Sequence, residues 1–352
     1  MVGRGLPACL TRNARSRRPL SPDGCPMRLA TIDVGTNTAQ LLVVEADGPT
    51  LRRVHAAERF VRLGEGVDAH GQIGPDARAR LLDALQEHQR AARTHGAGRV
   101  VAAGTSALRD AANRDDVLEA VREAVGLTIE ILSGKTEAAW SFAAACAAFD
   151  TLTGPCLVVD IGGGSTELIA GHDPTAHHPH TVDAITARAS LDVGCVRLTE
   201  RCFSAQPPAD EEVDRARCLI DAALRDAALN AGAAPTLIGT AGTATALALV
   251  HAGPDSTWDA LHGGGFALAH DDVQAWGERL LRMPVDDILA LHPDAMAGRA
   301  DVFPVGVLLL DRVMRHYDRD AVRVSPYELR HGLALRWLAQ HSGPPTGPHA
   351  AR

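Results

Sequence analysis

The stretch DIGGGSTE, residues 160–167, follows the apolar run CLVV at 156–159. Three consecutive glycines allow backbone N–H groups to converge on a ligand, because no Cβ atom stands in the way. After a Rossmann or Walker A glycine loop a helix begins at once, whereas here the strand-like run ELIAGHD (167–173) follows. The stretch therefore predicts a strand–turn–strand unit whose turn binds phosphate.

A second copy of this pattern occurs near the start of the chain, where residues 33–40 read DVGTNTAQ. Asp33 and Gly35 align with Asp160 and Gly162, and the apolar runs on either side align as well. A repeated supersecondary unit indicates a duplicated domain. Two ordinary tight hairpins are the alternative, but the match covers both the turns and their strands. We therefore predict two similar halves with a ligand held in the cleft between them.

The rest of the chain alternates strand-like apolar runs with amphipathic helical patterns, which predicts an α/β fold with substantially parallel sheets. We expect two domains, at 27–150 and 151–340, and a disordered tail at 341–352. Residues 1–26 are expected to be a disordered extension or to precede a true start at Met27. Strands are expected at 28–34, 40–46, 99–103, 128–132, 156–161, 167–173, near 189–193, 236–240 and 321–324. Helices are expected at 76–95, at 114–126, from about 133, and near 211–231, 244–251, 271–283, 302–316 and 331–340.

Composition narrows the class of protein. A chain of 352 residues with 46% hydrophobic and 22% charged residues is long enough for two domains with separate cores. No apolar run reaches the length of a membrane-spanning helix. The net charge of −8 argues against nucleic acid as a partner. Seven cysteines without a CxxC pair indicate free thiols in a reducing compartment, so we expect a cytoplasmic protein without a disulfide framework or zinc site.

A third small-residue loop, GTAGTAT at 239–245, follows another strand pattern and opens into an apolar helix. Phosphate at that helix N-terminus would be favourable, and Gly242 and Thr243 are the candidate ligands. A close-packed strand-to-helix turn is an equally good explanation of this loop alone. The hydroxyls of Thr36, Thr38 and Ser165 are further candidate donors to phosphate.

Acidic residues beside phosphate loops need a reason, since carboxylate and phosphate repel each other. A divalent cation can bridge the carboxylate and the phosphate, or the carboxylate can orient a water molecule and accept its proton. Asp33 and Asp160 each end a strand and are candidate Mg²⁺ ligands, although a turn-capping hydrogen bond is the alternative for both. Glu167, after the glycines, could position a water molecule or the metal.

Glu137, in ILSGKTEAAWSF (131–142), falls in the first turn of an expected helix. A glutamate there commonly complements the helix dipole or closes a capping box, and taken alone that explanation is favoured. Beside phosphate loops, however, a carboxylate at the hinge between two halves is a good general base. Cationic candidates for phosphate binding are Arg109, Lys135, Arg197 and Arg299.

These motifs resemble the exopolyphosphatase and guanosine pentaphosphate phosphohydrolase family (Ppx/GppA), within the actin-like, sugar-kinase and Hsp70 superfamily. The resemblance extends from Met27 to about Leu338 and fits the short two-domain form. The matching stretches are IDVGTNT (32–38), GTSALRDA (104–111), ILSGKTEA (131–138), VVDIGGGSTELI (158–169), DVGCVRLTERC (192–202), GTAGTATAL (239–247), LHGG (261–264), GRADVFPVG (298–306) and SPYELRHGLAL (325–335).

The resemblance implies duplicated actin-like domains of the ribonuclease H-like type (ASKHA) with an interdomain cleft. It makes Glu137 the catalytic base and associates Glu167 with the nucleophilic water. Asp160 is implied in Mg²⁺ and phosphate handling. The implied phosphate-binding residues, taken with those above, are Gly35, Thr36, Asn37, Thr38, Arg109, Gly162, Gly163, Gly164, Ser165, Thr166, Gly242 and Thr243. The sequence departs from the family at Gln40, where many members have a basic residue, and at FPVG (303–306).

The expected activity is Mg²⁺-dependent, processive hydrolysis of the terminal phosphate of inorganic polyphosphate, with K⁺ as a further candidate cofactor. Hydrolysis of guanosine pentaphosphate to the tetraphosphate, linked to the stringent response, is the alternative. An ATP-dependent kinase of the same superfamily and a non-catalytic sensor of alarmones or polyphosphate are further rivals. We expect a homodimer with polyphosphate or guanosine polyphosphates as ligands, and neither a membrane nor nucleic acid as partner.

Overall fold

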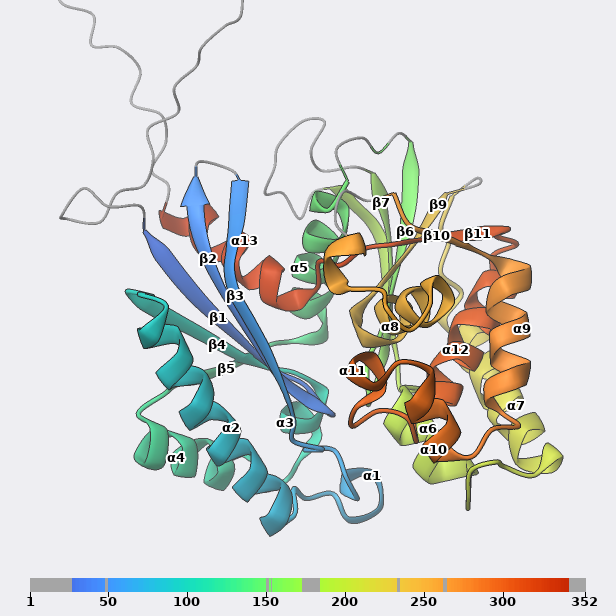
Figure 1. The fold of residues 1–352 in the computed structure, drawn as a ribbon, viewed down its shortest axis with the longest axis horizontal. Coiled ribbons are helices and arrows are strands. Elements are labelled where there is room, and N and C mark those ends of the chain that lie inside the picture. The colour runs from blue at the N-terminus through green and yellow to red at the C-terminus, as the bar shows by residue number, and fades with distance from the viewer. Residues whose placement is uncertain are drawn as a thin grey trace, which may run out of the picture.

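The computed structural model describes residues 27–341, except 48–49, 150–151, 153, 173–183, 233–234 and 262–264. The predictions for residues 1–26 and for the tail after residue 341 lie outside the described residues. Two α/β halves stand side by side, each with its own central sheet (Figure 1). Among the described helices, none is both long enough and apolar enough to cross a membrane.

The first sheet has five strands in the order β3-β2-β1-β4-β5. Strand β1 pairs antiparallel with β2 and parallel with β4, so the sheet is mixed. The helices α2 and α4 cover one face, where Leu81, Leu85 and Val121 lie buried against the sheet (Figure 1). The elements are β1 (Arg28–Val34), β2 (Thr38–Asp47), β3 (Thr50–Phe60), α1 (Val67–His70), α2 (Pro75–Thr94), β4 (Arg99–Gly104), α3 (Ser106–Asp110), α4 (Arg114–Val125) and β5 (Ile129–Ile131).

The second sheet repeats this topology in the order β10-β11-β9-β6-β7-β8. Strand β6 pairs antiparallel with β7 and parallel with β9, as β1 does with β2 and β4. This repeat confirms the predicted duplication. The elements are β6 (Pro155–Ile161), β7 (Thr166–His172), β8 (Ile185–Leu191), α6 (Cys195–Cys202), α7 (Asp210–Ala227), β9 (Thr236–Thr240), α8 (Ala241–Ala252), η3 (Trp258–Leu261), β10 (Ala267–Ala269), α9 (His270–Leu280), α10 (Val285–Leu291), α11 (Pro293–Met296), α12 (Phe303–His316) and β11 (Ala321–Val324).

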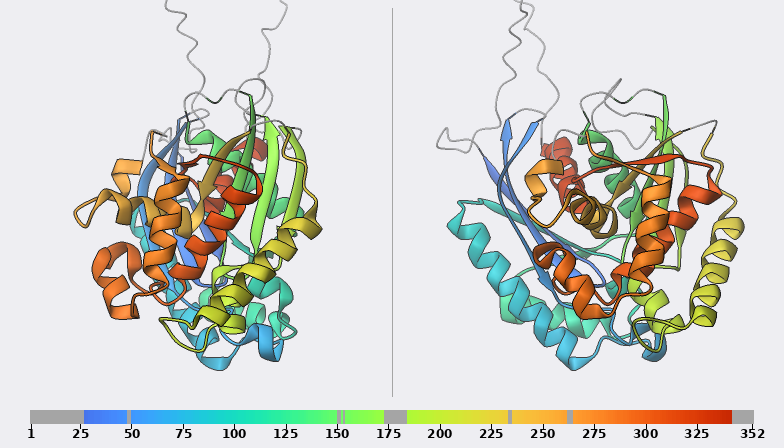
Figure 2. Two further views of the ribbon diagram at one scale, coloured as in Figure 1. Left: turned by 90° about the vertical axis from the view of Figure 1, so that its right-hand side faces the viewer. Right: turned by 45° about the vertical axis from the view of Figure 1, so that its right-hand side comes forward.

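Two helices cover the half opposite to their neighbours in the chain. Helix α5 (Gly134–Ala147) follows the first sheet, yet its Phe142 and Ala145 pack against Val158 and Ile169 of the second. Helix α13 (Leu329–His341) follows the second sheet but packs on α5 and on β1 and β2 of the first. Figures 1 and 2 show both helices between the sheets. The predicted domain boundary near residue 150 lies between the two sheets in the sequence. Helices α5 and α13 each pack against the half on the other side of it.

Several described elements differ from the sequence expectations, among them the short elements α1, α3, η3, β10, α10 and α11, which were not expected. The edge strand β3, TLRRVHAAERF, was not expected, because an edge strand that is half exposed shows no clear apolar alternation. Helix α6, CVRLTERC, lies in a stretch for which the sequence predicted a family motif but neither a helix nor a strand. The strand expected near 189–193 is β8, which ends at Leu191.

Candidate active site

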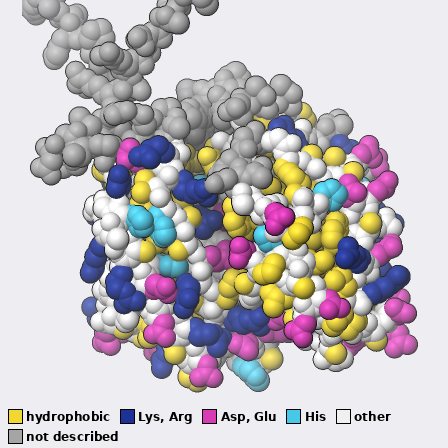
Figure 3. Space-filling view, in the orientation of Figure 1, with side chains coloured by type: hydrophobic (Ala, Val, Ile, Leu, Met, Phe, Trp, Pro, Cys, Tyr) yellow, Lys and Arg dark blue, Asp and Glu magenta, His cyan; other side chains and the backbone are white. Residues whose placement is uncertain are grey.

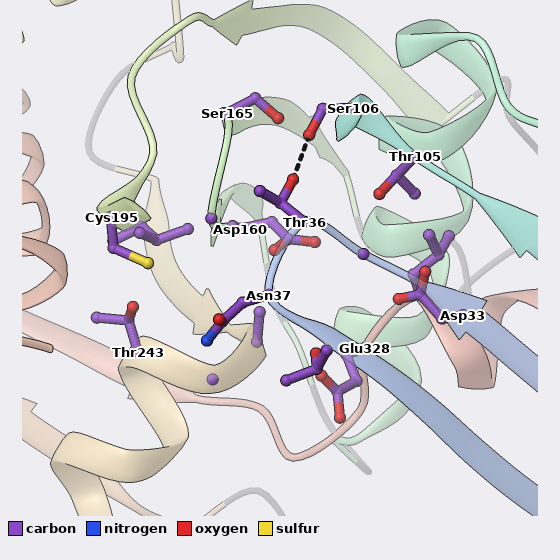
Figure 4. A pocket seen from close by; sticks show the side chains of 18 of the residues that line it. Asp33, Thr36, Asn37, Thr105, Ser106, Asp160, Ser165, Cys195, Thr243 and Glu328 are labelled. Atoms are coloured by element: carbon purple, nitrogen blue, oxygen red, sulfur yellow. Dashed lines mark hydrogen bonds between the residues drawn. The ribbon is translucent and has the colours of Figure 1, made fainter. Parts of the chain in front are cut away.

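The turns β1–β2 and β6–β7 face each other and enclose a cavity of about 120 Å³ (Figure 4). Within each turn a glycine N–H donates to a carbonyl three residues on: Gly35 to Thr38 at 2.8 Å, and Gly162 to Ser165 at 3.0 Å. The two halves of the duplication therefore have matching turns at the same site. The lining residues are Asp33, Gly35, Thr36, Asn37, Thr38, Gln40, Thr105, Ser106, Glu137, Asp160, Ile161, Gly162, Gly163, Ser165, Glu167, Cys195, Ala241, Gly242, Thr243, Arg299, Val302, Phe303, Glu328 and Leu329.

The two turns touch each other directly. A Cβ atom on Gly164 would lie 2.8 Å from the Ser106 Oγ atom and 3.0 Å from the Thr36 Oγ1 atom. Those two hydroxyls are themselves hydrogen-bonded at 2.8 Å (Figure 4). Glycine is therefore required here by contact with the opposite half, in addition to any approach of a ligand.

The third loop forms another wall of the cavity. Helix α8 begins at Ala241, and its first turn places Gly242 and Thr243 at the cavity. A Cβ atom on Gly242 would lie 2.2 Å from the Arg299 Nη1 atom, so this glycine is needed for the guanidinium to pack there. The free N–H groups of a helix start favour an anion at this end of the cavity.

Glu137 lies in the first turn of α5 with 7% of its surface exposed. Ser133 is the N-cap of the helix and accepts a hydrogen bond from the Thr136 N–H at 3.2 Å. Glu137 is thus one residue beyond the capping-box position, and its carboxylate instead accepts from the Arg109 Nη1 atom at 2.9 Å. Burial raises the pKa of Glu137, and Arg109 opposes that rise.

Three further carboxylates share this environment. Glu167 is 2% exposed and accepts from the Ser190 Oγ atom at 2.8 Å. Burial raises its pKa well above the usual range, and the charges of Glu137 and Asp160 raise it further. Burial likewise raises the pKa of Asp160 to about 7 and that of Asp33 well above its usual range.

The carboxylates fit a hydrated divalent cation. Among the described residues no three His, Cys, Asp or Glu side chains are grouped as a ready metal cage. Mg²⁺ typically takes only one or two carboxylates and completes its shell with water and phosphate oxygens. The Asp33 Oδ1 atom is buried and has no hydrogen-bond partner in the part of the chain that the structure describes, and Asp33 and Asp160 line the same cavity. Burial is the main cause that raises the pKa of both groups, and nearby carboxylates add to it, so a cation between them would favour their ionised forms.

Most of the residues predicted for the site line the cavity, but three lie behind its wall. Arg109 binds Glu137 and the Leu132 carbonyl, Thr166 donates to the Val193 carbonyl at 2.6 Å, and Gly164 packs on the opposite turn. Of the other cationic candidates, Arg299 lines the cavity and Lys135 is exposed.

Sequence reasoning missed Glu328, Ser106 and Cys195 as wall residues. Glu328 belongs to SPYELRHG, a stretch that carried the family resemblance without a role for its glutamate.

A larger cavity of about 690 Å³ adjoins the first and shares Gln40, Gly242, Arg299 and Glu328 with it. Basic and acidic side chains are interspersed on the face of the molecule shown in Figure 3.

At the boundary between the two cavities, Glu58 of β3 joins the halves. Its carboxylate accepts from the Gln40 Nε2 atom at 2.8 Å and pairs with Arg299 of the second half. Burial alone would raise the pKa of Glu58, but Arg299 and Gln40 outweigh it and hold the pKa below the usual value. Gln40, where the sequence departs from the family, therefore donates a hydrogen bond to Glu58.

Comparisons with known proteins agree with this geometry. The Ppx/GppA phosphatase family model matches residues 42–341. A curated relative, Exopolyphosphatase 2 of Mycobacterium tuberculosis, is 35% identical over 325 residues, which cover 88% of this chain and 98% of that protein. The guanosine-5'-triphosphate,3'-diphosphate pyrophosphatase of Vibrio campbellii is 31% identical, over 91% of this chain and 61% of its own length.

A solved structure of an exopolyphosphatase from Cytophaga hutchinsonii superposes with a TM-score of 0.78 at 26% identity, covering 89% of this chain and 98% of that one. This solved structure thus shares the fold of the chain. With the family model matching most of the described residues, the chain belongs to the Ppx/GppA phosphatase family.

Proposed function

We propose that the protein is an exopolyphosphatase, which hydrolyses the terminal phosphoanhydride bond of inorganic polyphosphate and releases orthophosphate. The observation that carries the proposal is the cavity of about 120 Å³, enclosed by two glycine turns and walled by Glu137 and Glu167. A cavity of that size suits the phosphate at a chain end. The relative named Exopolyphosphatase 2 supports the same activity.

In the proposed reaction, the oxygen of a water molecule attacks the terminal phosphorus and the bridging P–O bond breaks. Glu137 accepts a proton from the attacking water, and Glu167 helps to orient it. The departing chain end leaves with the bridging oxygen. The N–H groups of the two turns and of the α8 start would stabilise charge on the reacting phosphoryl group, where most catalysis of phosphoryl transfer resides.

We further propose Mg²⁺ as the cofactor, held by Asp33 and Asp160 with water. When bound, the ion would neutralise charge on the phosphate oxygens. The buried, unpartnered Asp33 Oδ1 atom supports this assignment. We also propose K⁺ as an additional cofactor, a homodimer, a cytoplasmic location and a part in the stringent response.

Hydrolysis of guanosine pentaphosphate is the second candidate function. The adjoining cavity of about 690 Å³ could take a group larger than phosphate, and its wall includes Phe60 and Trp258. The relative named guanosine-5'-triphosphate,3'-diphosphate pyrophosphatase supports this candidate too. Comparing kcat/KM for long polyphosphate with kcat/KM for guanosine pentaphosphate decides between them.

A phosphate-release assay on the wild type and on Glu137→Gln tests the proposal. Removal of a general base lowers kcat by about 10²–10⁴-fold, so the variant should lose nearly all turnover while its circular dichroism is unchanged. Glu130→Gln is the matched control, because Glu130 lies just before α5 but pairs with Arg336 at the surface. Turnover by folded Glu137→Gln at the wild-type rate would refute the assignment, and phosphate release undiminished by EDTA would refute the need for Mg²⁺. Tight polyphosphate binding without release would instead favour a sensor.

A further inference from the structure

Helix α6 connects the second glycine turn to the first half of the molecule. Its first N–H groups cap the turn: Cys195 donates to the Gly162 carbonyl at 2.9 Å, and Arg197 donates to the Gly163 carbonyl at 3.0 Å. The Arg197 backbone is therefore fixed to one wall of the active site. Its side chain leaves the second half and reaches elements of the first.

The Arg197 guanidinium lies among three carboxylates, and the Arg197 side chain is only 12% exposed. Its Nη2 atom is 3.0 Å from the Asp110 Oδ2 atom, at the end of α3. Its Nε atom is 3.4 Å from the Asp68 Oδ1 atom in α1, and its Nη1 atom is 3.2 Å from the Asp192 Oδ1 atom. The sequence suggested Arg197 as a phosphate ligand, whereas among the described residues its guanidinium makes its ion pairs with these carboxylates.

Helix α3 carries Arg109 and Asp110 in succession, and the two side chains have different partners. Arg109 binds Glu137 of α5 at 2.9 Å, while Asp110 binds Arg197. The Arg109 Nε atom is also 4.0 Å from the Asp110 Oδ1 atom. Asp110 thus stands between two guanidinium groups, one of which holds the proposed catalytic base. If Arg197 were lost, Arg109 would be the nearest cation to Asp110.

We propose that Arg197 is a positioning residue. Arg197, which belongs to the second half, binds Asp110 of the first half, and this leaves Arg109 free to hold Glu137. This inference rests on the proposed function, because it takes Glu137 as the base. It also makes assembly of the base depend on contact between the halves, since Arg197 comes from one half and Arg109 from the other.

The test is a set of phosphate-release kinetics on polyphosphate for Arg197→Gln, Asp110→Asn and the double variant. Arg197→Gln should lower kcat about tenfold or more, since misplacement of a catalytic group by about 1 Å can cost 10²-fold. KM should change by less than about twofold, because Arg197 does not contact the cavity. Asp110→Asn should be nearly neutral, and the double variant should regain most of the lost kcat, because the competing carboxylate is gone.

Arg201→Gln is the matched control. Arg201 lies on the same helix and also bridges the halves, with two contacts to Asp68 of 2.5 and 2.6 Å, but it does not reach Asp110. Its loss should leave kcat within about twofold. If Arg197→Gln does not fold, the neutral and similarly long Arg197→Met, alone and with Asp110→Asn, replaces it, with the same expected signs.

The proposal is overturned if Arg197→Gln loses no more kcat than Arg201→Gln, if the double variant is as slow as Arg197→Gln, or if the loss is in KM. A purely structural contact between the halves would give a double variant at least as impaired as either single one. Wild-type protein that releases no phosphate from polyphosphate would refute the proposed function. Normal wild-type turnover with an unimpaired Arg197→Gln would refute this inference alone.

Discussion

Asp160, at the end of β6, holds its proton at pH values where an isolated aspartate would be ionised. Burial raises its pKa from 3.8 to about 7, and the nearby charges of Glu137 and Glu328 contribute. The folded protein therefore binds this proton more tightly than the unfolded chain does. Between pH 4 and 7 the contribution of Asp160 to the free energy of unfolding falls as pH rises, and above pH 7 the full cost of its ionisation is present.

Asp160→Asn should therefore stabilise the metal-free protein while it impairs catalysis. At pH 8 the variant is expected to gain on the order of 2–4 kcal/mol in free energy of unfolding, since one pKa unit is worth about 1.4 kcal/mol. At pH 4 the two proteins should be nearly equal. Urea unfolding in EDTA at both pH values measures this, and an Asn variant that is less stable at pH 8 contradicts it.

The sequence alone left two roles open for Glu137, and the structure distinguishes them. The sequence placed it in a first helical turn, where a capping role and a catalytic role are both reasonable. The distinction comes from the N-cap at Ser133, which puts Glu137 beyond the capping-box position, and from Arg109, distant in sequence, which holds its carboxylate. Glu328 escaped notice because its proximity to Asp33 depends on how α13 packs on the opposite half.

At the scale of elements, the matching hairpins could be predicted because the repeat lies in contiguous sequence. Strand β3 could not, since its Arg, His and Glu side chains give no strand pattern and only pairing with β2 defines it. The contact between the two glycine turns was equally invisible. It joins Gly164 to Thr36 and Ser106, which are far apart along the chain.

Gly164→Ala tests that contact. The added Cβ atom would lie 2.8 Å from the Ser106 Oγ atom and 3.0 Å from the Thr36 Oγ1 atom, so these hydroxyls or the segments that carry them must shift. Overpacking of this kind costs about 1–3 kcal/mol, and we expect kcat to fall by about tenfold or more. Kinetics and thermal unfolding measure the two effects.

Gly98→Ala is the control for this variant, because a Cβ atom there meets nothing within 4 Å. Combining Gly164→Ala with Ser106→Ala removes the clashing oxygen and should restore part of the activity. Full activity in the single Gly164→Ala variant would show that the turns can separate without cost.

Considering the whole molecule, the two halves are not independent folding units. Leu29 and Leu42 of the first sheet are buried with Ala334 of α13, while Phe142 of α5 lies in the core of the second sheet. A fragment of residues 27–150 should therefore fail to fold alone, because one face of its sheet and the apolar face of α5 are both uncovered.

Expression of that fragment, with solubility and circular dichroism as readouts, tests the expectation. Co-expression with residues 151–341 should recover a folded complex, since the second fragment supplies both α13 and the sheet that α5 covers. A soluble, folded monomeric fragment would show that α13 is dispensable to the first half.

The position of α13 also has a consequence for biosynthesis. Ribosomes make the strands β1 and β2 early, but the helix that seals their inner face is translated only after the whole second sheet. Throughout that interval the nascent first half exposes an apolar surface, which is the kind of surface that aggregates or recruits chaperones. Because α13 packs on the first sheet but is translated last, the first half cannot complete its core until α13 has been synthesised.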